Sequence, residues 1–212
     1  MIKENTHGAV YLFAEQGSDT LFVIKKKPIT APGYEEAKRF VDIQHPNIVP
    51  MLGTSSNARS YILVMHYCNK GSLADRLNSP LSMSNFLHVA LAISRALRAA
   101  HQAGSLHGNL RPTNVLFDQF GQVRVSDFGL DEHYKHDALS NWYTRDTATK
   151  SRASDMYSAG VIFYQMLTGQ LPTWNQGLLV KPRAFLQVNK ALRAIVEKML
   201  SAEDKKGSPS FD

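Results

Sequence analysis

A stretch in the middle of the chain combines residue types that phosphoryl-transfer chemistry uses. It runs HGNLRPTNVLFDQFGQVRVSDFGL, from His107 to Leu130, and its pattern is that of a catalytic loop followed by a metal-binding loop. Such chemistry uses a group that takes a proton from the attacking hydroxyl. Asn109 stands where the pattern needs an acid, and an amide cannot take a proton at neutral pH. The stretch therefore indicates either a slow transfer site or a binding domain with the shape of an enzyme.

The elements that position these residues must fit into a chain of moderate length. The 212 residues, 43% of them hydrophobic, predict one domain or two tightly coupled lobes with a buried core. No apolar run approaches the length of a membrane span, and the first residues lack the apolar region of a signal peptide. We therefore expect no membrane segment in this chain. The lone cysteine, Cys68, excludes an internal disulfide, which favours a reducing compartment and a cytoplasmic location.

The net charge of +6 indicates a basic surface, a phosphate-bearing ligand or an acidic partner protein. The run Lys25-Lys26-Lys27 is short, and no aromatic residues are interleaved with it. A nucleic-acid surface usually combines longer basic patches with aromatic residues. We therefore expect no nucleic-acid partner.

The first third of the chain predicts a small sheet with one helix. Alternating residues predict strands at Val10–Glu15 and Leu21–Lys26, which a turn joins into a hairpin. Tyr34–Gln44 has the periodicity of a short helix. Two more strands are expected at residues 48–52 and 61–67.

The remainder predicts helices. Met83–Gly104 has apolar residues at helical spacing over a wide face, with Gly104 as a natural C-cap. Met156–Leu167 and Ala191–Leu200 are two further apolar helices. The hinge between the two halves is expected near Cys68–Gly71.

The order of the motifs resembles the protein kinase family. The matching stretches are FVIK (Phe22–Lys25), HPNIV (His45–Val49), VMHYCNKGSL (Val64–Leu73), HGNLRPTN (His107–Asn114), DFG (Asp127–Gly129) and SDMYSAGVIFYQMLTG (Ser154–Gly169). The gaps from Val10 to Lys25, from Asn109 to Asn114 and from Asn109 to Asp127 also fit that family's spacing.

This resemblance covers almost the whole chain and implies a fold. The implied fold is an α+β, bilobal protein-kinase-like fold, truncated at both ends. Residues 1–67 would form a small β-sheet N-lobe with one regulatory helix. Residues 68–212 would form a mostly helical C-lobe.

The resemblance also implies roles for charged residues. Lys25 would contact the α- and β-phosphates of ATP, and Glu36 would hold Lys25 by an ion pair. Asp127 and Asn114 would bind Mg²⁺. Arg111 stands where the family usually has a lysine near the transferred phosphate, which keeps the charge but changes its geometry.

Further positions would contact the nucleotide or build the interior. The nucleotide-binding positions implied by the resemblance are Gly8, Val10, Val23, Met65, His66, Tyr67, Cys68 and Leu116. Val23 stands where the family usually has alanine, and Met65 is a bulky gatekeeper, so both narrow the adenine pocket. A stack joining the two lobes would contain Met51, Phe40, Phe128 and His107. Asp155 would tie the anchoring helix to the catalytic loop.

Several residues depart from the family's pattern. Asn109 replaces the catalytic Asp, and Lys3 and Asn5 occupy two glycine positions of the phosphate-covering loop. Gly108 replaces an arginine that would bind a phosphorylated loop. Tyr143 replaces the glutamate that, in the family, ends the segment beginning at Asp127. The pair His133 and His136 has the spacing of metal ligands, but we interpret it as loop surface.

Three functions remain open from the sequence. The first is a pseudokinase that binds ATP weakly and acts with a partner protein as a regulatory or scaffolding module. The second is a slow but active Ser/Thr-type protein kinase. The third is an interaction scaffold that binds no nucleotide.

Overall fold

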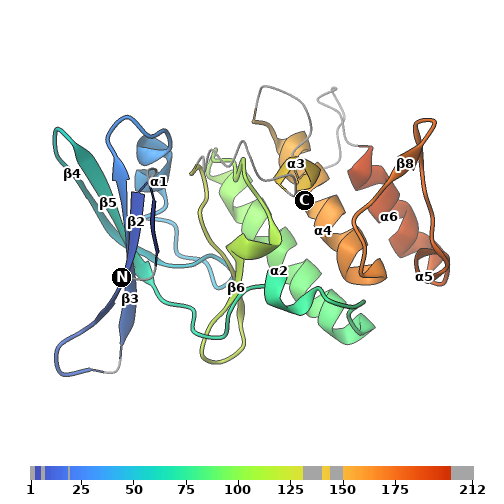
Figure 1. Cartoon of the computed structure of the whole chain (residues 1–212), viewed down its shortest axis with the longest axis horizontal. Coiled ribbons are helices and arrows are strands. Elements are labelled where there is room, and N and C mark those ends of the chain that lie inside the picture. The colour runs from blue at the N-terminus through green and yellow to red at the C-terminus, as the bar shows by residue number, and fades with distance from the viewer. Residues whose placement is uncertain (1–2, 6–7, 19, 131–139, 144–149, 202–212) are drawn as a thin grey trace.

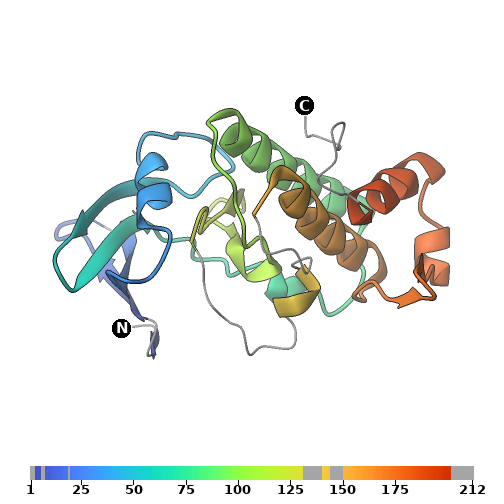
Figure 2. The ribbon, with the colours of Figure 1, turned by 90° about the horizontal axis from the view of Figure 1, so that it is seen from above.

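The computed structural model of the chain describes residues 3–5, 8–18, 20–130, 140–143 and 150–201. It has an α+β fold with a β-sheet lobe and a helical lobe (Figure 1). The sheet lies at one end of an elongated molecule, and the last helices lie at the other end (Figures 1 and 2). This is the two-lobed architecture that the sequence predicted.

The N-terminal lobe is one antiparallel sheet with the strand order β1-β2-β3-β5-β4. Its strands are β1 (Lys3–Asn5), β2 (Gly8–Ala14), β3 (Leu21–Pro28), β4 (Met51–Ser56) and β5 (Ser60–His66). The predicted hairpin of β2 and β3 is confirmed, and it places Val10 opposite Lys25.

The strand predicted at residues 48–52 is wrong in its position, because β4 begins only at Met51. Ile48 forms a parallel bridge to Val125, and the N–H of Val49 donates to the carbonyl of Val125 at 2.9 Å. Val125 belongs to β7 (Val123–Val125) of the other lobe. Pairing across the two lobes therefore takes these β-branched residues out of the sheet.

The helix predicted from Tyr34 to Gln44 is shorter in the structure, where α1 covers Tyr34–Arg39. The N–H groups of Phe40 and Val41 donate to carbonyls three residues back, which closes the helix with a tight turn. This turn brings the ring of Phe40 against Phe128, with centroids 4.7 Å apart. The tertiary contact thus accompanies the early end of the helix.

The C-terminal lobe contains the predicted helices and several short elements. Its helices are η1 (Ala74–Arg76), α2 (Met83–Gln102), η2 (Pro112–Asn114), α3 (Ser140–Tyr143), α4 (Arg152–Thr168), α5 (Arg183–Leu186) and α6 (Lys190–Leu200). Its strands are β6 (Val115–Phe117), β7, β8 (Trp174–Asn175) and β9 (Leu178–Leu179). Helix α4 begins four residues before the predicted start, because Ser151 and Ser154 form a capping box there.

Helix α4 is the centre of the helical core, buried on almost every side. At Gly160 it approaches α6 closely. A Cβ at this glycine would lie 2.8 Å from the Cβ of Met199 and 3.2 Å from the backbone nitrogen of Leu200. The missing side chain therefore lets the two helices pack in direct contact.

We expect Gly160→Val to lower the free energy of unfolding by about 2–3 kcal/mol, because overpacked interiors strain backbone and side chains. Urea denaturation measures this loss. Gly53→Val in β4 is the matched control, since a Cβ at Gly53 meets no atom within 4 Å. Equal losses in the two variants would contradict the close packing of α4 on α6.

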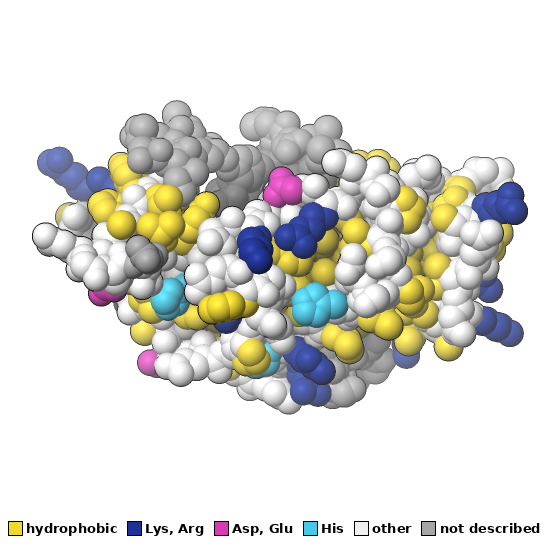
Figure 3. Space-filling view, turned by 90° about the horizontal axis from the view of Figure 1, so that it is seen from below, with side chains coloured by type: hydrophobic (Ala, Val, Ile, Leu, Met, Phe, Trp, Pro, Cys, Tyr) yellow, Lys and Arg dark blue, Asp and Glu magenta, His cyan; other side chains and the backbone are white. Residues whose placement is uncertain are grey.

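The charged side chains on one face of the molecule form several separate groups. On the face seen from below, separate groups of Lys and Arg side chains alternate with hydrophobic ones (Figure 3). On this face, binding of an anion would therefore depend on local arrangements of donors rather than on one continuous basic field. Within the described ranges, no helix has both the length and the apolar character needed to cross a membrane.

Candidate functional site

The two lobes meet at an ion pair between Lys25 and Asp127. Lys25 Nζ lies 2.6 Å from each carboxylate oxygen of Asp127. The side chains are 15% and 5% exposed, so the pair is largely shielded from water. Asp127 has a φ of 64°, an uncommon backbone conformation for a residue other than glycine. The chain adopts a strained conformation at the residue whose carboxylate faces Lys25.

The electrostatics of Asp127 follow from this geometry. Burial alone would raise the pKa of the Asp127 carboxyl, but the ammonium of Lys25 outweighs burial and holds the pKa below its ordinary value. Lys27 acts in the same direction. It is two residues from Lys25 on β3, on the same face of the strand, and is only 8% exposed. Asp127 is therefore an anion at neutral pH.

The ion pair described for Lys25 is with Asp127, and the predicted ion pair of Lys25 with Glu36 stays a prediction. Glu36 is exposed on α1, and among the described contacts it makes no ion pair with Lys25. The Cβ of Glu36 lies 2.5 Å from where a Cβ on Gly129 would be. Glu36 thus contacts the backbone that follows Asp127, while the carboxylate of Asp127 occupies the ammonium of Lys25.

The predicted stack between the lobes is present. The ring of Phe128 lies between Phe40 and His107, with centroid distances of 4.7 Å and 4.6 Å. Met51 is half-buried against the same core. These contacts place Phe128 in the interior, so the backbone next to Asp127 is held in position.

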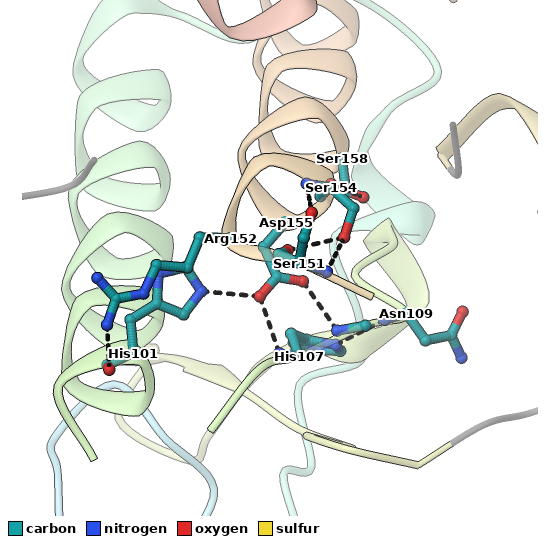
Figure 4. A network of polar contacts seen from close by, with 9 residues as sticks. His101, His107, Asn109, Ser151, Arg152, Ser154, Asp155 and Ser158 are labelled. Atoms are coloured by element: carbon teal, nitrogen blue, oxygen red, sulfur yellow. Dashed lines mark hydrogen bonds and ion pairs between the residues drawn. The ribbon is translucent and has the colours of Figure 1, made fainter. Parts of the chain in front are cut away.

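Asp155 anchors the catalytic loop, as predicted. Its Oδ2 accepts from the N–H of His107 at 2.9 Å and its Oδ1 accepts from the N–H of Gly108 at 2.8 Å. The sequence did not indicate a third partner, His101 on α2, whose Nε2 lies 2.8 Å from Oδ2 (Figure 4). Arg152 donates to the carbonyl of His101 at 2.9 Å. One carboxylate, 1% exposed, therefore connects α4, α2 and the loop.

His107 is a packed core histidine rather than a general base. It is fully buried, and its Nδ1 accepts from the N–H of Asn109 at 3.3 Å. Burial lowers the pKa of His107 below its ordinary value of 6.5. The ring is thus neutral at physiological pH.

This burial predicts a pH dependence of stability. Because the pKa of His107 is lower in the folded than in the unfolded chain, its contribution is fully present above about pH 6.5 and is lost as the pH falls below it. We expect urea denaturation between pH 7 and pH 5 to show a loss of up to about 1.4 kcal/mol per pH unit from this group. His45, also with a lowered pKa, acts in the same direction. A slope that is unchanged in His107→Phe would contradict the assignment to His107.

The catalytic loop brings Asn109, Arg111 and Asn114 together. Arg111 Nη2 donates to Asn109 Oδ1, and Asn114 Nδ2 donates to the carbonyl of Asn109 at 3.0 Å. Asn109 and Asn114 are 6% and 4% exposed. Asn109 Nδ2 is buried and has no hydrogen-bond partner among the residues that the structure describes. An orphaned buried donor of this kind costs about 1–3 kcal/mol.

Most of the predicted adenine-side residues lie in one apolar cluster. The buried members are Val23, Met65 and Cys68, and the half-buried residues that pack on them include Val10, Tyr67 and Leu116. His66 lies apart from them, with its ring against Phe22 at 5.6 Å. Burial raises the pKa of the Cys68 thiol to about 11, so this cysteine is an uncharged wall residue.

Among the described contacts, not every backbone N–H group of the hinge donates to a carbonyl. The N–H groups of His66 and Tyr67 donate to the carbonyls of Pro50 and Leu21, at 3.2 Å and 3.1 Å. Among the described contacts the N–H of Cys68 has no such partner. The hinge can therefore offer this N–H to a ligand beside the apolar cluster.

The phosphate-covering segment is a strand pair at its described positions. Lys3 and Asn5 lie in β1 and face Val10 and Gly8 of β2 in register. Gly8 has a φ of 140°, and a Cβ there would lie 2.3 Å from the carbonyl oxygen of Lys26. Glycine at this position is thus required by close contact between backbones of neighbouring strands.

Two departures from the family's pattern have local replacements. Where the arginine is missing, the stem of Lys150 covers Gly108, since a Cβ at Gly108 would lie 2.5 Å from Lys150 Cδ. Tyr143 donates to Gln165 Oε1 at 2.6 Å, and its carbonyl accepts from Ser158 at the same distance. The sequence did not indicate Lys150 or Gln165, because these partners meet only through the fold.

The remaining predicted features concern metal ligands. His133 and His136 lie outside the described residues. Within the described ranges, no group of His, Cys, Asp and Glu side chains has the arrangement of a metal site. The oxygen ligands expected for Mg²⁺ would come from Asp127 and Asn114. Asn114 would contribute an amide oxygen, and asparagine is not one of the four residue types that define such a group.

Comparison with known proteins agrees with this geometry. The family description "Protein kinase domain" matches residues 4–210. Calcium-dependent protein kinase 11 of Arabidopsis thaliana is 30% identical over 234 aligned positions, which cover 94% of this chain and 47% of that protein. CBL-interacting protein kinase 21 of Oryza sativa subsp. japonica is 33% identical, covering 65% of this chain and 29% of that protein. The probable serine/threonine-protein kinase PknB of Lactococcus lactis is 29% identical, covering 65% and 24%.

The chain spans about half the length, or less, of these curated relatives. The family match nevertheless extends over both lobes. The ion pair of Lys25 with Asp127 and the loop held by Asp155 lie inside the matched residues. Two lobes, a lysine on β3 and the ordered loop motifs thus agree with the similarity, and the chain belongs to the protein kinase family.

Proposed function

We propose that this domain is a pseudokinase, a regulatory module that binds ATP weakly and acts through a partner protein. The observation that carries the proposal is the orientation of Asn109. Its carbonyl oxygen accepts from Arg111, so the group left over at the base position is an amide N–H donor. A donor cannot take the proton of an attacking hydroxyl.

Nucleotide binding is supported by three features of the residues where the two lobes meet. Lys25 supplies a shielded cation for phosphates. The apolar cluster around Val23 and Met65 offers surface to a base, and the N–H of Cys68 offers a donor beside it. Val23 and Met65 are both buried and bulky, which supports weak rather than tight binding.

The residues present fit Mg²⁺ in type. Asp127 provides carboxylate oxygens and Asn114 an amide oxygen, and Mg²⁺ prefers such oxygen ligands. When bound, the metal would neutralise phosphate charge. To bind the metal, the carboxylate of Asp127 would have to give up its contact with Lys25, because both of its oxygens lie against Lys25 Nζ. This competition also supports weak binding.

A slow Ser/Thr-type kinase is the second candidate. The stack of Phe40, Phe128 and His107 and the contacts of Asp155 are complete. Phosphoryl transfer depends mainly on positioning and charge, so loss of the base need not abolish it. A relative named as a serine/threonine-protein kinase supports the Ser/Thr class.

A scaffold without nucleotide is the third candidate, favoured by the bulk of Val23. The lone cysteine supports a site of action in the cytoplasm.

Calorimetry with ATP, with and without Mg²⁺, tests the proposal. We expect measurable binding in both conditions, together with transfer of labelled phosphate to a generic protein substrate that stays near background. Absence of ATP binding in both conditions would leave the scaffold without nucleotide as the remaining candidate function. Sustained transfer would establish the slow kinase instead.

Restoring the acid should change transfer little. We expect Asn109→Asp to raise phosphate incorporation by less than about tenfold, although a general base typically contributes about 10²–10⁴-fold. Lys3 and Asn5 remain in β1 in that variant, so the phosphates stay poorly positioned. The triple variant with Lys3→Gly and Asn5→Gly should exceed the product of the separate effects. A jump of about a hundredfold or more from Asn109→Asp alone would identify a kinase that lacks only its base.

A further inference from the structure

The outer face of α2 carries an exposed apolar stripe. Met83, Leu87 and Leu91 are 45%, 45% and 51% exposed. They recur every four residues, so they lie on one face of the helix. The other side of α2 is buried in the helical core, where it packs against α4 (Figure 2). A helix that is apolar on both faces normally lies inside a protein or an assembly. The stripe therefore indicates a contact that the described residues do not supply.

Two arginines continue this stripe along the helix. Arg95 follows Leu91 by four residues and Arg98 follows Arg95 by three, which keeps both on the same face. Both side chains are exposed, and neither guanidinium forms an ion pair or a hydrogen bond with a described residue. No Asp or Glu occurs in α2. Burial, and then repulsion by Arg98 and Arg95, lower the pKa of the neighbouring His45. The positive charge at this end of the stripe is thus not neutralised locally.

The order of apolar and basic residues specifies the chemistry of what covers the stripe. A straight row of side chains on a helix fits between the ridges of a second helix. The row from Met83 to Arg98 is about 22 Å long, at about 1.5 Å per residue, which matches about four turns of such a helix. The second helix needs apolar side chains opposite Leu87 and Leu91, and carboxylates opposite the two arginines.

The charges also favour one direction for the second helix. Arg95 and Arg98 lie in the C-terminal half of α2. A helix that runs antiparallel to α2 begins beside them, and Asp and Glu are favourable in the first turn of a helix because of its macrodipole. The same carboxylates would therefore stabilise their own helix and pair with the arginines. A parallel helix would need them near its C-terminal end, where they are unfavourable.

We propose that the outer face of α2 is a docking surface for an acidic amphipathic helix of a partner protein, bound antiparallel to α2. Its acidic first turn pairs with Arg95 and Arg98, and its apolar residues cover Leu87 and Leu91. The inference rests on the proposed function in that it names the partner of a regulatory module. It uses none of the residues assigned to nucleotide binding, so each of the two can fail without the other.

Fluorescence anisotropy with labelled synthetic helices tests the inference. The probe is an acetylated, amidated helix of alanine, glutamine and lysine, with two glutamates in its first turn and leucines on later turns of the same face. One control peptide has lysines in place of the glutamates, and the other has alanines in place of the leucines. We expect the probe to bind at least about tenfold more tightly than either control, because each control loses the ion pairs or the apolar contact.

A charge reversal locates the site on α2. The double variant Arg95→Glu with Arg98→Glu should weaken probe binding by at least about tenfold and should bind the lysine control peptide instead. Its matched control is Arg59→Glu with Arg183→Glu, which reverses two exposed arginines outside α2 and should leave both affinities unchanged. Binding of the lysine peptide by the α2 variant also shows that this variant is folded.

Several outcomes would overturn the inference. The probe could fail to bind, as it would if other residues of this chain occupied the face, or it could bind no better than its lysine control. The α2 variant could fail to bind the lysine peptide. Binding to phosphatidylserine vesicles that requires Arg95 and Arg98, without binding of the probe, would identify a lipid surface instead. ATP binding by a chain that does not bind the probe would leave the nucleotide part of the proposed function standing.

Discussion

Replacing Asp155 with alanine is expected to lower the free energy of unfolding by about 3–5 kcal/mol, the usual cost of breaking a buried charged network. The carboxylate is 1% exposed and accepts from His107, Gly108 and His101. Alanine would leave two backbone N–H groups and a ring nitrogen buried without an acceptor. Each such group loses its partner without regaining water.

Urea denaturation measures the loss, and Asp42→Ala is the matched control because Asp42 is an exposed aspartate. The control is expected to change stability by less than about 0.5 kcal/mol. Asp155→Asn separates shape from charge, since it retains the volume but turns one acceptor into a donor. A loss from Asp155→Ala as small as that from the control would mean that the loop is held by other contacts.

Replacing Lys25 with methionine is expected to have two large effects. Without ligand, Asp127 becomes a buried anion that has lost its closest cation, which should lower the free energy of unfolding by about 3 kcal/mol. With ATP, the loss of a charge-assisted contact to phosphate should weaken binding by about 10–100-fold, with or without Mg²⁺. Asp127→Asn should weaken only the part of ATP binding that depends on Mg²⁺.

A double-mutant cycle tests the pair. Lys25→Met combined with Asp127→Asn should be more stable than the sum of the single losses, because neither charge is then left unpaired. Lys26→Met, the exposed neighbour on β3, is the matched control for removing a lysine. Additive losses would show that the ion pair does not contribute to stability. Equal losses of ATP affinity in the two single variants without Mg²⁺ would contradict the separate roles of Lys25 and Asp127.

Much of the fold could be predicted from local sequence. The hairpin of β2 and β3 and the helices α2, α4 and α6 follow from alternation, helical periodicity and caps, which depend on near neighbours in the chain. The end of α1 and the start of β4 could not be predicted. Ile48 and Val49 have strand propensity, but Val125 of the other lobe pairs with them instead of β5. Such a choice between two partners depends on distant residues.

For the site, the sequence by itself determined which chemical groups are present. It supplies Lys25 and Asp127, an amide at position 109 and no arginine at position 108, and the order of these motifs is enough to indicate the family. These properties belong to single residues and their spacing. They are therefore readable without any coordinates.

Only the tertiary structure decided which groups meet. It pairs Lys25 with Asp127 while Glu36 stays exposed, and it places Lys150 over Gly108. It also orients the amide of Asn109 so that its oxygen accepts from Arg111, while its N–H group has no acceptor among the described residues. Spacing along the chain cannot predict these contacts, because each joins side chains whose distance depends on how two lobes or two loops pack. The energy of a charge or a hydrogen bond changes steeply over a few ångströms and with burial. The same set of residues could therefore form a competent or an incompetent site, and packing selects the arrangement that this chain adopts.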